Sequence, residues 1–263
     1  MKDNGRISQA QGDHLRILLG EKMAQFWINL NFGIYLAVFG FALIRNFNFN
    51  IILVGCIYLA PLIPLGLTPD NADRFLLISF FNTIFGIIEL IIFTVTVKKE
   101  DMTFDKPFFV QLFGHSLPIG AALIGLSYVS RMTAIPVTPY ELTLILALFL
   151  VGAILRVVAV YQLGVVAFKF DIVFREKQTL KTDQLYGRMR HPSYTAMMVV
   201  ILAFAVTTHS WMAAILGLLT AWFGFQFRIH FEEKALAKQY GKEYESFRAK
   251  TSMWLPGRLL KKS

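Results

Sequence analysis

Long apolar stretches separated by short polar segments run along most of this chain. A helix that crosses a lipid bilayer needs about 20 mostly apolar residues, and several stretches approach or exceed that length. They comprise residues 26–44, 51–67, 75–97, 108–129, 142–168 and 194–227. The last stretch is long enough for two helices and is interrupted by polar residues at 207–210, which indicates a helical hairpin. The pattern therefore predicts an all-α, polytopic transmembrane bundle of about 6–7 helices with a C-terminal helical hairpin.

Composition supports a membrane protein. Hydrophobic residues make up 56% of the 263 residues and charged residues only 16%, whereas a soluble domain carries roughly a quarter charged residues. The formal net charge of +9 indicates contact with anionic lipid headgroups rather than with nucleic acid, because no basic face is separate from the apolar stretches. We expect membrane lipids as partners and no nucleic-acid binding. The single cysteine, Cys56, excludes an intrachain disulfide.

Basic residues predict the orientation of the C-terminal half. They are concentrated in residues 169–190 and in the tail that follows residue 228, and both segments flank the predicted hairpin on one side. The positive-inside rule places this side in the cytoplasm, of a bacterial inner membrane or of the endoplasmic reticulum. The basic N-terminal segment, residues 1–25, falls on the opposite side if every early stretch spans. Either one early segment is re-entrant, or the N-terminus is exported against the rule.

The densest polar segment lies immediately before the hairpin and contains Arg190, His191 and Tyr194. Pro192 suits the first turn of a helix, where its missing N–H costs nothing. His191 would then stand at the helix entrance, where free N–H groups and the helix dipole favour an anion. Arg190 and His191 can therefore hold a carboxylate or phosphate, or they can simply anchor the helix at the lipid headgroups.

A second polar segment closes the hairpin. Arg228 and Glu232 are four residues apart, so they share one helix face and can pair. Glu233 follows directly, and acids at membrane depth are costly and tend to be functional. Because the hairpin turn makes its two ends neighbours, these residues should face Arg190 and His191. Such an arrangement suits a zwitterionic ligand.

The order of these motifs resembles the isoprenylcysteine carboxyl methyltransferase family and its relatives. The shared features are R-H-P-x-Y at 190–194, a hydrophobic hairpin, R-x-x-x-E-E-x-x-L at 228–236, Y-G-x-x-Y at 240–244 and a closing Pro256. The resemblance covers about residues 150–256. It implies an enzyme with a site for S-adenosylmethionine at the cytosolic face of a helical bundle, which methylates a lipophilic or small hydrophobic acceptor, with a carboxylate favoured.

The resemblance also implies a role for individual residues. Arg228 and Glu232 match the catalytic positions between the cofactor and acceptor pockets. The implied cofactor-binding residues are Leu180, Tyr186, Arg190, His191, Tyr194 and Glu233. No metal site is implied. Residues 141–263 then form a methyltransferase-like catalytic half, and residues 26–140 are transmembrane helices without an assigned role.

The chain departs from the family pattern at several positions. Gln184 and Leu185 replace a usual Gly-Pro, Ala196 replaces a Gly, and a His ahead of the adenine segment is absent, with Gln178 nearby. Other reaction classes therefore stay open. They are phospholipid N-methylation, thiol S-methylation, NADPH-dependent reduction of the sterol type, and a non-enzymatic transporter or scaffold.

Three polar residues inside the apolar stretches bear on the last alternative. Glu89 and Arg156 either mark a transport pathway or pair with each other as buried structure. His115 is expected to be a hydrogen-bonded core residue.

Overall fold

The computed structural model describes residues 3–96, 104–164 and 179–256, with side chains from residue 20 onward. The described elements are helical. They are α1 (Asp3–Arg45), α2 (Phe49–Leu59), η1 (Ala60–Leu62), η2 (Pro69–Asn71), α3 (Ala72–Thr96), α4 (Lys106–Gln111), η4 (Leu112–Ser116), α5 (Leu117–Met132), α6 (Pro139–Leu163), α7 (Pro192–Thr207), α8 (Trp211–Tyr240) and α9 (Lys242–Lys250).

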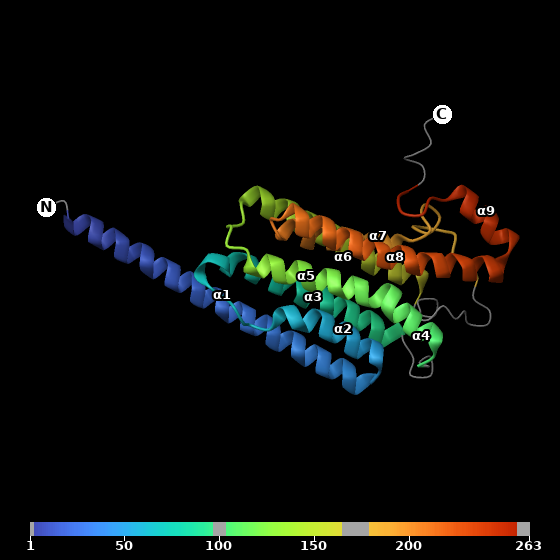
Figure 1. The fold of residues 1–263 in the computed structure, drawn as a ribbon, viewed down its shortest axis with the longest axis horizontal. Helices are drawn as coiled ribbons and strands as arrows, with labels where there is room; N and C mark the ends of the chain where they lie inside the picture. The colour runs from blue at the N-terminus through green and yellow to red at the C-terminus, as the bar shows by residue number, and fades with distance from the viewer. Residues whose placement is uncertain (1–2, 97–103, 165–178, 257–263) are drawn as a thin grey trace, which may run out of the picture.

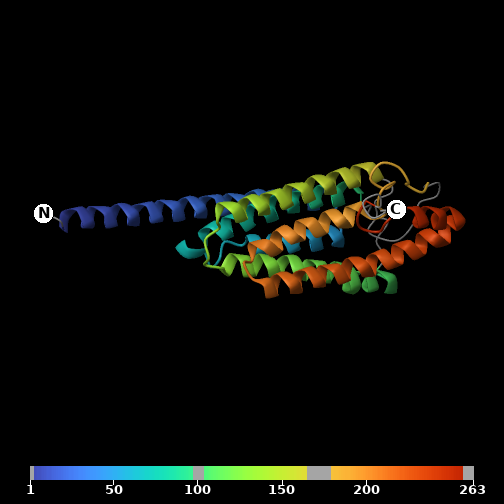
Figure 2. The ribbon, with the colours of Figure 1, turned by 90° about the horizontal axis from the view of Figure 1, so that it is seen from above.

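The longer helices lie side by side along one axis, and the chain runs up and down through them (Figure 1). α3, α6 and α8 end at the same end of the bundle, where α2, α4 and α7 begin and where α9 lies. The N-terminal part of α1 projects beyond the other end, and the view from above shows the same (Figure 2). The C-terminal hairpin therefore opens toward the end at which α3 and α6 end and α4 begins.

The helix lengths agree with a membrane protein. Within the described part of the chain, five helical segments are long and apolar enough to cross a bilayer: Gly20–Arg45, Pro69–Thr96, Lys106–Met132, Pro139–Leu163 and Trp211–Tyr240. Two shorter apolar helices, Phe49–Leu62 and Pro192–Thr207, complete the bundle. The predicted all-α transmembrane bundle is confirmed, and so is the hairpin, which turns at Thr208–Ser210 between α7 and α8.

The second predicted span was too long. Its helix begins at Phe49, capped by the Asn48 side chain, and the helical backbone ends at Leu62 rather than at residue 67. Ile63 has an extended ψ of 121°, because a residue that precedes proline, here Pro64, is driven out of the helical region.

The ends of two other predicted segments also differ. The predicted polar segment 1–25 is helical from Asp3 and continuous with the first span in α1. α6 ends at Leu163, five residues before the predicted end, because Gly164 adopts a φ of 85° that stops the helix. Residue 168 itself lies outside the described residues.

Arg74 joins four segments at the end of the bundle where the hairpin turns. It is 1% exposed. Its guanidinium donates to both oxygens of Glu141 on α6, at 2.8 and 3.0 Å, and to the Thr207 carbonyl at the end of α7, at 2.7 Å. Its Nε donates to the Ile135 carbonyl. A buried charge is tolerated when it is paired and hydrogen-bonded in this way.

α6 and α7 approach each other closely at Gly152. A Cβ added at Gly152 would lie 2.8 Å from the Val200 backbone nitrogen and 3.0 Å from the Ala196 carbonyl oxygen. Neither backbone atom can rotate away, so the two helices meet through a position where only glycine fits. This contact sets α7 against α6 beside the predicted site.

We expect Gly152→Ala to lower the free energy of unfolding by about 1–3 kcal/mol, because the added methyl forces α6 and α7 apart. Thermal unfolding of the detergent-solubilised protein, followed by circular dichroism, measures this change. Gly33→Ala on α1 is the matched control, since nothing lies within 4 Å of its added Cβ. Equal unfolding temperatures for the two variants would contradict the proposed close contact.

Candidate functional site

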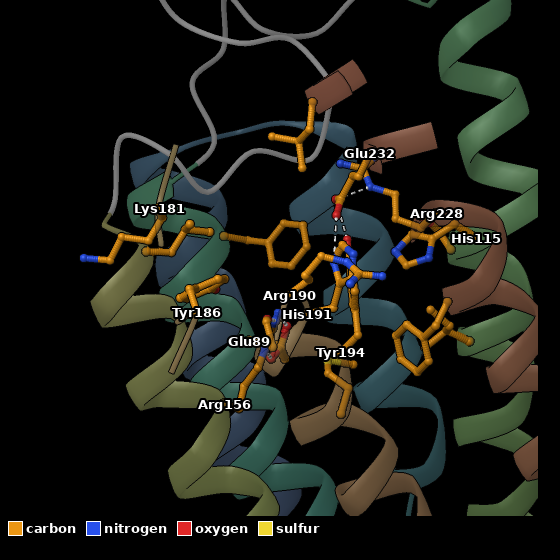
Figure 3. A pocket seen from close by; sticks show the side chains of 18 of the residues that line it. Glu89, His115, Arg156, Lys181, Tyr186, Arg190, His191, Tyr194, Arg228 and Glu232 are labelled. Carbon is orange, nitrogen blue, oxygen red and sulfur yellow. Dashed lines mark hydrogen bonds and ion pairs between the residues drawn. The ribbon is translucent and has the colours of Figure 1, made fainter. Parts of the chain in front are cut away.

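A cavity of about 240 Å³ opens at the end of the bundle where α7 begins. Seven of the eight predicted site residues line it: Leu180, Tyr186, Arg190, His191, Tyr194, Arg228 and Glu232. In Figure 3, Arg190, His191 and Tyr194 lie between Tyr186 on one side and Arg228 with Glu232 on the other. The hairpin thus brings together the two polar segments, as predicted from the sequence.

The entrance of α7 is fixed by the C-terminal tail. His191 is the N-cap residue and Pro192 the first helical residue, as predicted. The backbone N–H of Arg190 donates to the Ser252 carbonyl at 2.9 Å, and that of His191 donates to the Met253 carbonyl at 3.2 Å. The tail therefore holds the backbone that carries both basic side chains.

Arg228 and Glu232 pair across one turn of α8. The Nε of Arg228, a residue only 3% exposed, lies 2.9 Å from the Glu232 Oε1, and the Tyr194 hydroxyl donates to the same oxygen at 2.5 Å. The Arg228 Nη1 also donates to the side-chain oxygen of Gln111, at 3.2 Å. The guanidinium is held from two sides, which fixes its orientation toward the cavity.

Glu233 has a different position from the other predicted site residues. It does not line the cavity. Its Oε1 accepts from the Arg190 Nε at 2.7 Å and lies 3.3 Å from the His191 Nε2. Because a carboxylate accepts and does not donate, the Nε2 carries the proton of this bond. Glu233 thus holds the two basic residues from outside the cavity. The second ring nitrogen of His191, Nδ1, lies 3.7 Å from the Glu232 Oε2.

Tyr186 forms part of the opposite wall of the cavity. Its hydroxyl donates to the Ala159 carbonyl at 3.2 Å. Burial raises the pKa of the Tyr186 phenol well above its usual range, so the hydroxyl stays protonated at neutral pH. Leu180 is half-buried beside it. Gln178, the residue nearest to the missing family histidine, lies outside the described residues.

A buried ion pair lies deeper along the same wall. Glu89 on α3 accepts two hydrogen bonds from Arg156 on α6, at 2.7 and 2.8 Å, and both residues line the cavity. Arg156 also contacts the Ser193 hydroxyl. The sequence left open whether the two charged residues mark a transport pathway or pair with each other, and they pair.

Several lining residues were not predicted. Asn50 and Ser116 come from helices without an assigned role. Gln111, which is not among the lining residues, accepts a hydrogen bond from Arg228. Tyr244 and Phe247 on α9 also line the cavity. Tyr244 and Phe247 are aromatic residues three positions apart in an otherwise polar segment. This spacing indicates one apolar helix face, from which their burial could have been predicted. His115 is hydrogen-bonded, as predicted, with its Nδ1 at 3.1 Å from the Gly224 carbonyl oxygen, and it lines the cavity as well.

Comparison with known proteins gives one matching family. Residues 144–238 match the family model of isoprenylcysteine carboxyl methyltransferase (ICMT). This segment runs from α6 to near the end of α8 and contains the eight predicted site residues.

Curated relatives match part of the chain. A probable protein-S-isoprenylcysteine O-methyltransferase of Oryza sativa subsp. indica is 28% identical over 112 residues, which are 42% of this chain and 59% of that protein. The protein-S-isoprenylcysteine O-methyltransferase of Schizosaccharomyces pombe is 32% identical over 77 residues, 29% of this chain and 33% of that protein. The matched region thus spans about 59% or less of the length of these two relatives.

A solved structure extends the comparison of the fold to most of the chain. A eukaryotic intramembrane Ras methyltransferase ICMT superposes with a TM-score of 0.52 and 14% sequence identity, over 89% of this chain and 97% of that one. At this identity the likeness concerns the fold alone. This chain therefore resembles the ICMT family over residues 144–238, and its membrane fold resembles that of a solved ICMT.

Proposed function

We propose that this chain is an S-adenosylmethionine-dependent methyltransferase that methylates a carboxylate on a lipophilic acceptor. The observation that supports this function best is the cluster of Tyr194, Arg228 and Glu232 at the polar end of a largely apolar cavity. The family model of isoprenylcysteine carboxyl methyltransferase matches residues 144–238, which contain this cluster. We place the site on the cytoplasmic side, from the basic loops beside it.

The residues present fit this cofactor. It would supply a methyl group activated on a sulfonium. The Glu232 carboxylate provides negative charge for a cationic centre, and Arg190 and His191 provide basic groups for its carboxylate. Tyr186 and Leu180 offer an aromatic and an aliphatic surface for the adenine ring. Glu233 would act through Arg190 and His191, since it braces them without reaching the cavity.

Methyl transfer to a carboxylate needs alignment more than acid–base catalysis. The carboxylate is ionised at neutral pH, so no proton has to be removed. One carboxylate oxygen would form the new bond to the methyl carbon, and the electron pair of the broken carbon–sulfur bond would stay on the sulfur. Arg228 would hold the acceptor anion in line, and Glu232 and Gln111 would hold Arg228. Holding two reactants in attack geometry can contribute several kcal/mol, up to about 7–11, to lowering the barrier.

The apolar wall of the cavity supports a lipophilic acceptor. It is formed by side chains from α2, α3, α5 and α7, including Val54, Phe93, Ile119 and Met197. Contact with these residues would remove the hydrocarbon part of the acceptor from water, which contributes roughly 25 cal/mol of favourable free energy per Å² of apolar surface buried. A chain of isoprenoid or acyl type therefore gains affinity here, while its carboxylate meets Arg228.

We expect the purified protein to transfer label from methyl-labelled S-adenosylmethionine to an S-prenylated N-acetylcysteine, and base to release this label as expected for a methyl ester. Label that resists base would favour N- or S-methylation. Absence of S-adenosylmethionine binding would exclude the proposed function. NADPH binding in its place would favour a reductase.

A further inference from the structure

We infer that His230, Lys234 and Lys238 on the outer face of α8 form a binding site for the headgroup of an anionic phospholipid. These three side chains are exposed, whereas Arg228 and Glu232 of the same helix line the cavity. The inference goes beyond the proposed function, because it concerns the lipid around the protein and holds whether or not a methyl group is transferred. It assigns the lipid contact expected from the net charge to one helix face.

One row of exposed side chains runs along most of α8. Successive members are three, four or seven residues apart, and these spacings keep them on one face of a helix. The members are Leu216, Leu219, Phe223, His230, Lys234 and Lys238. The side chains up to Phe223 are apolar, and those from His230 onward are basic. The row therefore changes its character between these two residues.

The length of α8 places this change at the edge of the bilayer. α8 begins at Trp211, which is 76% exposed, and tryptophan is enriched at the membrane interface. A helix rises about 1.5 Å per residue, so about 20 residues cross the hydrocarbon core of about 30 Å. Counted from Trp211, this distance ends beside His230, at the level of the lipid headgroups. The long side chains of Lys234 and Lys238, one and two turns further on, can extend back to this level.

The acids of this part of α8 belong to the inner side of the bundle. Figure 3 shows Glu232 beside Arg228 at the cavity, and Glu232 and Glu233 both pair with arginines. In the part of the chain that the structure describes, neither Lys234 nor Lys238 takes part in an ion pair. The outer face therefore presents positive charge that no described carboxylate neutralises.

The chemistry of the row determines what it binds. Ammonium and imidazole N–H groups donate to the oxygens of a phosphate. The apolar side chains next along the row favour an anion that is attached to hydrocarbon. Phe227 and Phe231, with ring centroids 4.9 Å apart, add apolar surface next to His230. A phospholipid with a net negative charge meets both requirements, whereas a zwitterionic phospholipid brings its own cation close to the lysines.

Competition between two phospholipids with the same acyl chains tests the inference. Native mass spectrometry of the full chain in detergent measures how much phosphatidylglycerol and how much phosphatidylcholine it retains, and we expect the parent protein to prefer phosphatidylglycerol. For Lys234→Gln/Lys238→Gln we expect its apparent affinity to fall by about 10- to 25-fold, since each basic residue near an anionic lipid contributes about fivefold. His230→Phe removes one N–H donor and should lower it by about threefold.

Two further variants separate a site from overall charge. Lys234→Arg/Lys238→Arg keeps both charges on the row and should keep the preference. Lys242→Gln/Lys250→Gln is the matched control, because both lysines are exposed on α9 and the variant loses the same charge away from the row. It should retain phosphatidylglycerol as the parent protein does. Unfolding temperatures without added lipid should be similar for all variants, since exposed substitutions change stability little.

Several outcomes would overturn the inference. One is equal retention of the two phospholipids by the parent protein. Another is a loss of equal size in the α9 control, which would show that overall charge attracts the lipid. A third is displacement of phosphatidylglycerol by inorganic phosphate at an equal concentration, which would assign the row to a free anion. None of these measurements uses S-adenosylmethionine or turnover, so failure here and failure of the proposed function are distinguishable.

Discussion

Glu232→Gln is expected to lower kcat/KM for methyl transfer by about 100- to 1,000-fold, the cost typical of removing one pre-organised electrostatic contact from an active site. Oε1 of Glu232 receives the Arg228 Nε and the Tyr194 hydroxyl. Glutamine keeps the shape of the side chain, but it removes the negative charge beside the guanidinium. Arg228 would then lose the orientation in which it holds the acceptor. Kinetics with labelled S-adenosylmethionine in detergent or liposomes measure the loss.

The control for this variant is Glu243→Gln. Glu243 is exposed on α9, so its charge should not affect turnover. S-Adenosylmethionine binding to Glu232→Gln, measured separately by calorimetry, distinguishes a loss of binding from a loss of alignment. Normal turnover by Glu232→Gln would exclude the proposed role of this residue.

Glu89→Leu is expected to destabilise the protein by about 3–5 kcal/mol, because it removes the carboxylate that pairs with a buried arginine. Both members of the pair are only 3–4% exposed, and they share two hydrogen bonds. The double variant Glu89→Leu/Arg156→Met should recover most of this loss, since replacing both charges leaves no buried charge behind. Unfolding midpoints in detergent measure both effects. Equal destabilisation by the single and double variants would show that the pairing contributes little.

Much of the fold follows directly from the sequence. The polar interruption at 207–210 predicted the hairpin, Pro192 predicted the start of α7, and Gly241 ends α8 with a φ of 52°. The four-residue spacing of Arg228 and Glu232 predicted their pairing. These features are local, because the residues involved are neighbours along the chain or on one helix face.

Other features depend on contacts between distant segments, and no local pattern reveals them. The Glu89–Arg156 pair joins residues 67 positions apart. The position of Glu233 outside the cavity depends on α9. Glu233 pairs with Arg190, and the Nη1 of Arg190 also donates to the Arg248 carbonyl on α9, at 3.1 Å. The places of Asn50 and Ser116 in the cavity wall become visible only when α2 and η4 are packed around one cavity.

The bond between Arg74 and the Thr207 carbonyl has a consequence for biosynthesis. It joins residues 133 positions apart. The bond can therefore form only after the chain has been synthesised from α3 through the end of α7. Closing a loop costs conformational entropy, and this cost grows only slowly with the length of the loop. A fragment that begins after α3 would lack the guanidinium that anchors the turn of the hairpin. The turn of the hairpin is therefore secured only when both α3 and the end of α7 are present.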